Sequence, residues 1–456
     1  MRWLQKAGMM NPSRDVKTIF LKAVEAVDPH TLIARCLRKE GTTLSIEGAG
    51  TRLTEDLSRY ETVLVLGVGK ASASMAGAVE HILKDTVSRG AVITTYGQAG
   101  RLERIRVLEA GHPIPDENSV EGARILAQLA READSHTLIL NLVSGGGSAL
   151  FSLPREGITL RDKQETTRLL LESGAAIAEI NCIRKHLSSV KGGNFAKMAC
   201  PARMINLILS DVVGDRLEAI ASGITAPDPS TFREAFDTLK KYRLVDKVPS
   251  AVKRTIESGI RGTLPETPKE GDPAFENVEN ILVGNNLVAC RAAEAHGRKL
   301  GYDARILTSS LTGEAREIAK FFASIAKDLE KGISEFKKPA LLISGGETTV
   351  TIRGKGKGGR NQEMALAFLA DLLDGSVDLG SISFLSAGTD GADGPTDAAG
   401  AFVSSGIEEK MEGLGLKADD FLDTNDSYRF FEATDHLFKT GPTGTNVCDI
   451  QLLIVV

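Results

Sequence analysis

Short apolar runs alternate with amphipathic segments along most of the chain, and this alternation constrains the fold more than any other feature of the sequence. In the first half, the apolar runs end in glycine or aspartate, as in TVLVLGVG, TLILNLVSGGG and MINLILSDVVGD. Between them lie segments with apolar residues at helical spacing, such as SASMAGAVEHILKD and SVEGARILAQLAREA. Strands that alternate with helices predict a mostly parallel sheet with helices on both faces.

A polar stretch rich in proline and glycine, residues 258–280, interrupts this pattern, which then resumes with ILVGNN, ALLISGGET and SISFLSAG. A chain of 456 residues is long for one domain, and two or three are expected. We therefore expect two α/β domains with a cleft between them. The predicted limits are residues 1–260 for the N-terminal domain and residues 275–456 for the C-terminal domain.

The composition argues against several classes of protein. The formal net charge is −5 and no long basic stretch is present, which disfavours a nucleic-acid binder. The five cysteines are scattered and form no CxxC pair, so neither a disulfide framework nor a structural zinc site is expected. No apolar run approaches the length of a membrane span, and the N-terminus lacks the features of a secretory signal. We expect a cytoplasmic protein without nucleic-acid or membrane partners.

The segment VLVLGVGKAS places Lys70 directly after an apolar strand and two glycines. It matches a dinucleotide fingerprint only in part, because Ser72 stands where that pattern needs a third glycine or alanine. A P-loop needs four residues between its first glycine and the Gly-Lys pair, and this chain has one. Lys70 therefore requires another explanation.

The segment SGGGS, residues 144–148, also follows an apolar run. In parallel sheets, ligands bind beyond the carboxyl ends of the strands. Successive unhindered N–H groups at such a place can form an anion site, to which both serines can donate. A tight turn that needs positive φ is the alternative, but three consecutive glycines exceed what such a turn usually requires. The motif does not distinguish phosphate from carboxylate.

Carboxylates follow two further apolar runs, in SDVVGD and GTDGADG. Aspartate often caps helices or makes turns, and for each residue alone this explanation is at least as good. One or two carboxylates that hold magnesium together with substrate phosphates would give the same pattern. Asp211 and Asp390, each the first carboxylate after its apolar run, are the better candidates for metal ligands.

The segment GKGKGGRNQE places Lys355, Lys357 and Arg360 among glycines just before a predicted helix. Fixed positive charge at a helix start suits a phosphoryl group that is being transferred. For the two lysines a solvated basic turn is the better interpretation, whereas Arg360 is the better functional candidate. His112 and His186 are weak evidence, and the chain has no HExxH or GxSxG motif. The residues alone predict a small-molecule phosphotransferase.

The ordered motifs GVGKAS, SGGGSAL, SDVVGD, SGGET, GKGGRNQE, SAGTDGADGPTDAAGA and GPTGTNVCD resemble those of the class II glycerate kinases, the MOFRL-type glycerate 2-kinases. This resemblance runs from about Val16 to the C-terminus. It implies phosphorylation of D-glycerate at its 2-hydroxyl with ATP and Mg²⁺, in an active site between a Rossmann-like N-terminal domain and a C-terminal α/β domain. It also implies that Lys70 and Arg360 are essential.

We expect other residues of these motifs to bind substrate or phosphate, and Asp211 or Asp390 to orient the metal or accept the proton of the glycerate hydroxyl. The expected binding residues are Gly69, Ser144, Gly145, Gly146, Gly147, Ser148, Ser344, Gly345, Gly346, Glu347 and Asn361.

Two other functions compete with the kinase. Members of the same family have carried the label hydroxypyruvate reductase, which would use NAD(P)H. A dinucleotide site wants an acidic residue at the end of the second strand, where this chain has Thr94 and Thr95, so the reductase is disfavoured. A non-catalytic ligand-binding protein would need the anion sites but neither Arg360 nor the carboxylates. A monomer or small homo-oligomer is expected.

Overall fold

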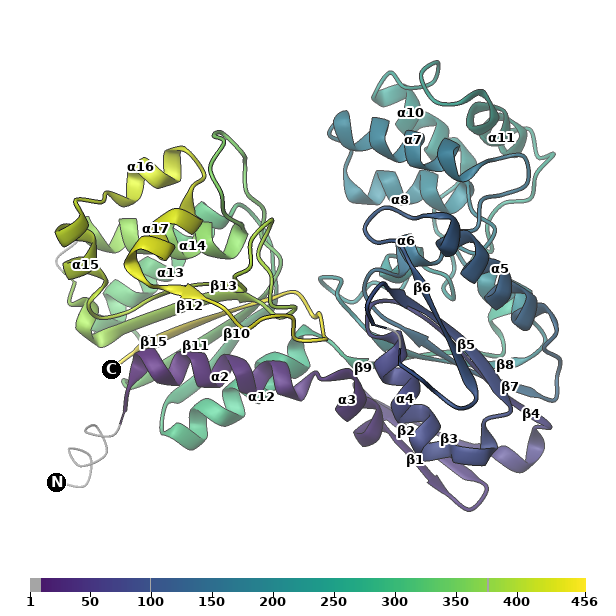
Figure 1. Cartoon of the computed structure of the whole chain (residues 1–456), viewed down its shortest axis with the longest axis horizontal. Coiled ribbons are helices and arrows are strands. Elements are labelled where there is room, and N and C mark those ends of the chain that lie inside the picture. Colours follow the sequence, from purple (N-terminus) through teal and green to yellow (C-terminus); the bar gives the residue numbers. More distant parts are fainter. Residues whose placement is uncertain (1–9, 99, 375–376) are drawn as a thin grey trace. The chain divides into compact units, whose positions relative to one another are not determined.

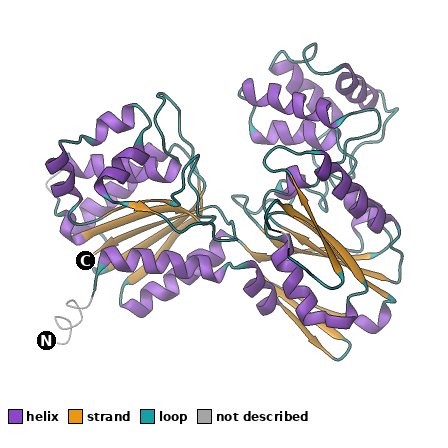
Figure 2. Cartoon of the chain, viewed as in Figure 1, coloured by secondary structure: helices purple, strands orange, loops and turns teal. Residues whose placement is uncertain are grey.

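A computed structural model describes residues 10–98, 100–374 and 377–456 and divides into two compact units. One unit is Pro29–Gly284, which we call the Rossmann-like unit. The other combines the described residues up to Asp28 with Asn285–Val456, and we call it the C-terminal unit. Both are layered α/β structures (Figures 1 and 2).

The central sheet of the Rossmann-like unit has six parallel strands in the order β6-β5-β4-β7-β8-β9. If the six strands are numbered 1 to 6 along the chain, this order is 3-2-1-4-5-6, which is the order of doubly wound dinucleotide-binding folds. The prediction of a Rossmann-like sheet is therefore confirmed. The strands are β4 Thr62–Val68, β5 Arg89–Thr95, β6 Ile105–Ala110, β7 Thr137–Val143, β8 Arg203–Leu209 and β9 Val278–Gly284.

Helices cover both faces of this sheet, which explains why its strands read as continuous apolar runs. All seven residues of β7 are buried. Helices α5 (Glu117–Arg131) and α9 (Asn194–Ala199) share a core with the strand residues Leu64, Leu66 and Ile139. Helix α4 (Ser72–Leu83) contacts β4, β5 and β7 and packs against α3 (Pro29–Cys36). The strand order reverses between β4 and β7, and ligands bind at such a point in open parallel sheets.

Two additions to the Rossmann-like unit were not predicted from the sequence. One is a small antiparallel sheet made of β1 (Leu37–Glu40), β2 (Thr43–Gly48) and β3 (Thr51–Asp56). The other is a group of helices with a core of its own. Its members are α7 Leu160–Glu172, α8 Ile177–His186, α10 Phe232–Lys241 and α11 Ser250–Ile260, beside the short α6 Gly147–Leu150.

The C-terminal unit has a mixed sheet in the order β10-β11-β15-β12-β13-β14. Among its described neighbouring strands, β10 and β11 pair in parallel and the other pairs are antiparallel. Helices α13 to α17 lie on one face, and α2 and α12 on the other (Figure 1). The strands are β10 Asp303–Leu311, β11 Ala340–Gly346, β12 Ile382–Gly388, β13 Gly400–Val403, β14 Leu437–Phe438 and β15 Asp449–Val455. The helices are α2 Pro12–Ala26, α12 Asn286–Leu300, α13 Ala315–Glu330, α14 Arg360–Leu373, α15 Ile407–Leu414, α16 Ala418–Asp423 and α17 Ser427–Thr434.

The limits of the two units differ from the predicted residues 1–260 and 275–456 at both ends. Strand β9, which the sequence pattern suggested as the start of the second domain, pairs with β8 through Ile281 and Leu207 and completes the first sheet. Helix α2 buries Val16, Phe20 and other apolar residues in the C-terminal unit, where it packs on α12. Both differences arise from contacts between segments that are distant in sequence.

No helix in the described part of the chain is both long enough and apolar enough to cross a membrane.

Candidate active site

Lys70 lies just beyond β4, at the point where the strand order of the Rossmann-like sheet reverses. Gly69 before it has φ +129, and a Cβ at this position would lie 2.2 Å from Ser144 Oγ. The Lys70 N–H donates to the carbonyl of Gly145 at 2.8 Å, and the Ala71 N–H donates to Ser144 Oγ at 3.0 Å. The close approach of the two strand ends therefore explains why glycine precedes the lysine.

The turn after β7, residues 144–148, is the glycine turn. Gly146 has φ +83, and a Cβ on Gly145 would collide with Asp211 Oδ2. Within the described residues, no acceptor receives a hydrogen bond from the N–H groups of Gly145, Gly146 or Gly147. Ser148 Oγ lies 2.7 Å from Ser222 Oγ. The glycine turn thus presents successive amide donors that can receive an anion.

The Lys70 side chain passes over the glycine turn beside His112. A Cβ added to Gly146 would lie 3.1 Å from Lys70 Cγ and 3.1 Å from His112 Cδ2. Partial removal from water lowers the pKa of His112 to about 4, with a further contribution from the charge of Lys70. The imidazole is therefore neutral near pH 7. In the described part of the chain, Lys70 Nζ has no hydrogen bond or ion pair, so its charge is available to a ligand.

Arg360 is the first residue of α14 and is held by two carboxylates. Its Nε and Nη2 donate to the two oxygens of Asp449 at 2.5 and 2.9 Å, and its Nη1 lies 2.9 Å from Glu347 Oε1. Asp449 is fully buried at the start of β15, whereas the Arg360 side chain is 33% exposed. Such a bidentate pair fixes the plane of the guanidinium and leaves N–H groups free for a ligand.

The electrostatics of this cluster follow from burial and from the crowding of carboxylates. Burial by itself lowers the pKa of Arg360, but its hydrogen bonds to Asp449 and the charges of Asp449 and Glu347 raise it overall. Partial removal from water raises the pKa of Glu347, against the opposing effect of Arg360. Burial raises the pKa of Asp393 to about 6. Perturbed carboxyl groups of this kind are typical of functional sites.

Asn361, Ser344 and the glycines of SGGE lie inside the C-terminal unit. The Asn361 side chain donates to Asp393 at 3.3 Å and accepts from Ser386 at 2.6 Å, with no exposed surface. Ser344 is also buried. A Cβ on Gly345 would collide with the side chain of Asn286. Because they are buried, these residues are placed to fix the position of the Arg360 cluster.

Asp390 lies just beyond β12, and its Oδ1 accepts a hydrogen bond from the Ala392 N–H at 3.1 Å. Its charge contributes to the raised pKa of Glu347, so the two carboxylates lie close together. The described residues contain no group of three or more His, Cys, Asp or Glu that could hold a metal by themselves. Magnesium in kinases is commonly held by one or two carboxylates together with substrate phosphates, and Asp390 or Asp211 fits that limited role.

The loop before α14, residues 354–359, is held in place by contacts. Gly354 and Gly356 pack on the backbone of residues 424–426, and the Lys357 N–H donates to Asp426 at 2.8 Å. Lys357 Nζ lies 3.7 Å from the centre of the Tyr428 ring, a cation–π contact. The glycines therefore allow close packing of the backbone.

The predicted site residues form two groups. Lys70, the glycine turn and Asp211 come together in the Rossmann-like unit, and Arg360, Glu347 and Asp390 come together in the C-terminal unit. Sequence reasoning did not assign roles to Asp449 or Asp393. Both stand in the sequence motifs GPTGTNVCD and GTDGADG, but Asp449 precedes its apolar run, so the rule that selected Asp211, a carboxylate directly after an apolar run, did not find it.

Two family descriptions match the chain. A "Domain of unknown function (DUF4147)" covers residues 15–257 and the "MOFRL family" covers residues 340–449. These ranges contain Lys70 and Arg360 respectively.

Named relatives match almost the full chain. "Glycerate 2-kinase" of Pyrococcus horikoshii is 42% identical over 97% of this chain and 98% of its own length. "D-glycerate 2-kinase" of Thermotoga maritima is 44% identical over 96% of this chain and 97% of its own length. A "Putative hydroxypyruvate reductase" of Agrobacterium vitis is 40% identical over 86% of this chain and 99% of its own length.

A solved structure agrees with these sequence matches. The crystal structure of glycerate kinase from Thermotoga maritima superposes with a TM-score of 0.83 and is 40% identical, covering 97% of this chain and 99% of that chain. Fold, motifs and full-length similarity all point to one assignment. The chain belongs to the class II glycerate kinase family, whose C-terminal part is the MOFRL domain.

Proposed function

We propose that the chain is an ATP-dependent glycerate 2-kinase that converts D-glycerate to 2-phospho-D-glycerate and ADP. The observation that carries the proposal is the placement of Lys70. Its ammonium has no hydrogen bond or ion pair in the described part of the chain, and its side chain passes Gly146 of the glycine turn, where the strand order reverses. Names of close relatives and the carboxylate-held Arg360 support the same reaction.

Lys70 and the glycine turn would bind negatively charged oxygens of the substrates. Phosphoryl transfer needs little covalent chemistry from the protein, and its catalysis rests on positioning and on neutralising charge. A lysine supplies a mobile point charge, while the amides of Gly145 to Gly147 supply fixed donors. The flexible lysine could follow the phosphoryl group as it is transferred, while the fixed amides could hold an anionic group that does not move.

Arg360 would stabilise the phosphoryl group during transfer. Asp449 holds its Nε and one Nη in a fixed plane, so the remaining N–H groups are oriented before substrate arrives. Preorganised donors of this kind need no rearrangement when charge develops. Asn361 and Asp393 have a positioning role. The buried carboxylate of Asp393 accepts hydrogen bonds from the backbone and side chain of Asn361, the residue after Arg360 at the start of α14.

The transfer forms one bond and breaks one bond. The 2-hydroxyl oxygen of glycerate bonds to the γ-phosphorus of ATP, the bond from that phosphorus to the bridging oxygen breaks, and ADP leaves. The hydroxyl proton needs an acceptor, and Asp390 and Asp211 are candidates, as the sequence suggested. Glu347 is a further candidate, since its half-exposed carboxylate lies beside Arg360 and partial removal from water raises its pKa, which makes it a stronger base.

Magnesium is proposed as the companion of ATP, with Asp390 or Asp211 as its protein ligand. Bound there, it would neutralise phosphate charge. The small number of carboxylates available fits an ion that is held mainly by the phosphates of its nucleotide.

A hydroxypyruvate reductase is the second candidate, because relatives with that printed name match the chain at 40% identity. A dinucleotide in this fold places a ribose hydroxyl near an acidic residue at the end of the second strand. Here β5 ends at Thr94 and Thr95, and Thr94 Oγ1 is bonded to the Lys70 carbonyl at 3.1 Å. This arrangement favours the kinase.

A coupled assay separates the two functions. ADP release from ATP is measured with and without D-glycerate, and oxidation of NADH or NADPH is measured with hydroxypyruvate. The proposal expects ADP release that requires both D-glycerate and magnesium, and no oxidation of the nicotinamide. Nicotinamide oxidation without glycerate-dependent ADP release would replace the kinase with the reductase.

A cytoplasmic location and a monomeric or small homo-oligomeric state are also proposed. All five cysteines are unpaired, which fits a reducing compartment. Cell fractionation and light scattering after size exclusion would check these two points.

A further inference from the structure

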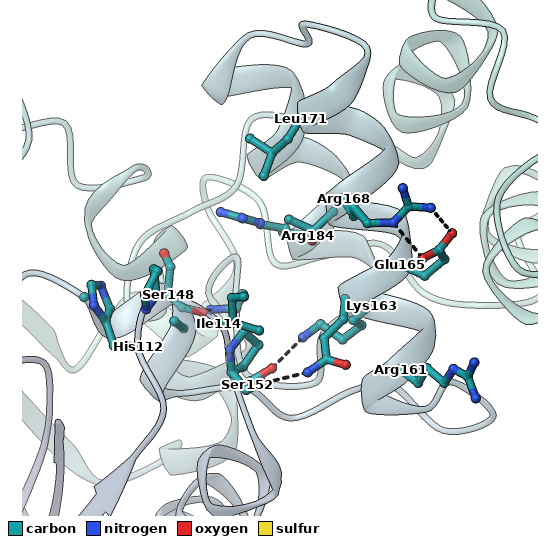
Figure 3. Close-up of a pocket in the computed structure, with 17 residues that line it drawn as sticks. His112, Ile114, Ser148, Ser152, Arg161, Lys163, Glu165, Arg168, Leu171 and Arg184 are labelled. Atoms are coloured by element: carbon teal, nitrogen blue, oxygen red, sulfur yellow. Dashed lines mark hydrogen bonds and ion pairs between the residues drawn. The ribbon is translucent and has the colours of Figure 1, made fainter. Parts of the chain in front are cut away.

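A pocket of about 730 Å³ lies within the Rossmann-like unit, between the glycine turn and helices α7 and α8 (Figure 3). We call it the cationic pocket. Its lining includes Gly146 and Ser148 of the glycine turn. Its basic residues are Arg161, Lys163, Arg168, Arg184 and Lys191, against one carboxylate, Glu165.

Three of these cations have no carboxylate partner within the described residues. Lys191 is 1% exposed, and its Nζ donates to the Ser148 carbonyl at 2.7 Å. Lys163 is 7% exposed, and its Nζ donates to Ser152 Oγ at 3.2 Å. Arg184 is half-buried, and its guanidinium extends into the pocket (Figure 3) without a hydrogen bond from the part of the chain that the structure describes. Buried cations are normally paired, so this cluster requires an explanation.

Two basic residues next to this cluster do have carboxylate partners. Lys185, next to Arg184, forms an ion pair with the buried Asp228 at 3.1 Å. Arg168 pairs with Glu165 and Glu172, both at 2.6 Å. Lys163, Arg184 and Lys191 thus differ from these neighbours in having no carboxylate partner within the described residues.

The three cations also repel one another. Burial and, to a smaller extent, the charge of Arg184 together lower the pKa of Lys163 to about 7. Burial lowers the pKa of Lys191 well below its usual value, with added contributions from Lys163 and Arg184. Positive charges that are buried close together without carboxylates destabilise the folded protein, and an anion bound in the pocket would offset this repulsion.

The exposed part of the lining includes apolar side chains beside the ion pair of Arg168 and Glu165. Ile114 and Leu171 both line the pocket, and they are 68% and 59% exposed. Large apolar side chains with this exposure at the edge of a polar pocket are suited to the faces of a flat ring. The pocket therefore combines buried cations with two exposed apolar side chains.

We infer that the cationic pocket binds the nucleoside triphosphate, with its phosphates against Lys163, Arg184 and Lys191 and its base against Ile114 and Leu171. This inference rests on the proposed function. Glycerate carries a single carboxylate and could neutralise one of the three cations, whereas a triphosphate carries enough charge for all of them. The volume is also in the range of drug-sized ligands, about 300–1,000 Å³, and exceeds what a three-carbon acid needs.

Binding of ADP to the full-length protein, measured by isothermal titration calorimetry without glycerate, tests the inference. Arg184→Gln removes a cation that has no partner to lose, so its effect on folding is small. We expect it to weaken ADP about tenfold or more, and Lys163→Met to do the same. Arg124→Gln is the matched control, because Arg124 is exposed on α5 and pairs only with Glu121. It should leave ADP affinity unchanged.

Inorganic tripolyphosphate and D-glycerate complete the test. Leu171→Ser should weaken ADP but not tripolyphosphate, because only ADP has a base. Arg184→Gln should weaken both phosphate ligands while D-glycerate affinity stays within about threefold. Unchanged ADP affinity in both cation variants, or loss of D-glycerate binding in place of ADP binding, would overturn the inference. Normal ADP binding to the wild type without glycerate-dependent turnover would instead count against the proposed function alone.

Discussion

At the scale of single residues, the two cations that the family resemblance marks are held in different ways. The Lys70 side chain passes Gly146 of the glycine turn, and its ammonium has no partner within the described residues, whereas Arg360 is fixed by the buried carboxylate of Asp449. A lysine has one point charge on a flexible stem, whereas arginine has a planar set of donors. Under the proposed function, Arg360 therefore takes the role that requires donors in a fixed plane.

Arg360→Lys tests this difference. The lysine keeps the positive charge but cannot bond both oxygens of Asp449 and still present donors to a phosphoryl group. We expect kcat/KM for glycerate-dependent ADP release to fall about 100-fold or more. Arg429→Lys, at an exposed arginine with one partner, Asp426, should retain the wild-type value. Comparable activity of the two variants would contradict the assigned role.

Asp393 should make stability depend on pH. Burial raises its pKa to about 6 in the folded state, above its value in the unfolded chain, so the folded state binds the proton more tightly. The stabilisation is complete below the unfolded pKa and is lost as pH rises through about 6. Relative to Asp393→Asn, the wild type should therefore lose stability between pH about 4 and about 6.

Urea midpoints measured across that pH range check this expectation. Asp397→Asn serves as the control, because the exposed Asp397 carboxyl has its pKa lowered to about 2 by bonds to Lys439 and Tyr428. The difference in urea midpoint between Asp397→Asn and the wild type should stay constant over the same pH range. A constant difference for Asp393→Asn as well would show that Asp393 stays ionised.

At the scale of elements, the ends of strands β4 and β7 build the candidate site. They come so close that Gly69 has no room for a side chain, since its Cβ would lie 2.5 Å from the Ser144 carbonyl oxygen. Gly69→Ala should therefore lower the free energy of unfolding by roughly 2 kcal/mol or more and reduce activity. Gly97→Ala isolates the effect of positive φ, because Gly97 has φ +78 and open space around it. An equal cost for the two variants in urea unfolding would contradict the close packing of the strand ends.

Helix α2 is joined to the C-terminal unit through its apolar face. Phe20 is fully buried there, with its ring 5.3 Å from that of Phe438. Phe20→Ala should lower the free energy of unfolding of the C-terminal unit by about 3–5 kcal/mol. It should also speed amide hydrogen exchange in α12, β12 and β15, while the amides of β4 and β7 stay protected. Leu21→Ala, at a half-exposed position of the same helix, should have little effect. Faster exchange in β4 and β7 would contradict the assignment of α2 to the C-terminal unit.

Sequence patterns predicted those elements whose signals are local. Helices α4, α5, α12 and α13 have apolar residues at helical spacing, and the buried strands read as continuous apolar runs. The small sheet β1–β3 was missed because its strands are short and largely exposed. Strand β9 was recognised but not its sheet, because strand pairing between distant segments leaves no mark in a local pattern.

The candidate site shows the same limit. Lys70 and the glycine turn follow strands directly, and the rule for ligand positions in parallel sheets was enough to find them. The bond between Arg360 and Asp449 joins residues 89 positions apart, and the cationic pocket gathers side chains from several elements. Neither could be predicted without the fold.

At the scale of the whole molecule, the proposed reaction draws on residues from both compact units. The Rossmann-like unit carries Lys70, the glycine turn and the cationic pocket, and the C-terminal unit carries Arg360 with its carboxylates. Each unit matches a family description of its own, and relatives named as kinases match both together. The account therefore assigns one reaction to the complete chain.

Phosphorus NMR of the product tests this claim most directly. The full-length protein is incubated with Mg-ATP and D-glycerate, and the new phosphate ester is observed with coupling to hydrogen. Transfer to the 2-hydroxyl places phosphorus next to a carbon with one hydrogen and gives a doublet, which the account predicts for the wild type and not for Lys70→Ala or Arg360→Ala. A triplet would identify the 3-phosphate, and either a triplet or no new ester in the wild type would contradict the account.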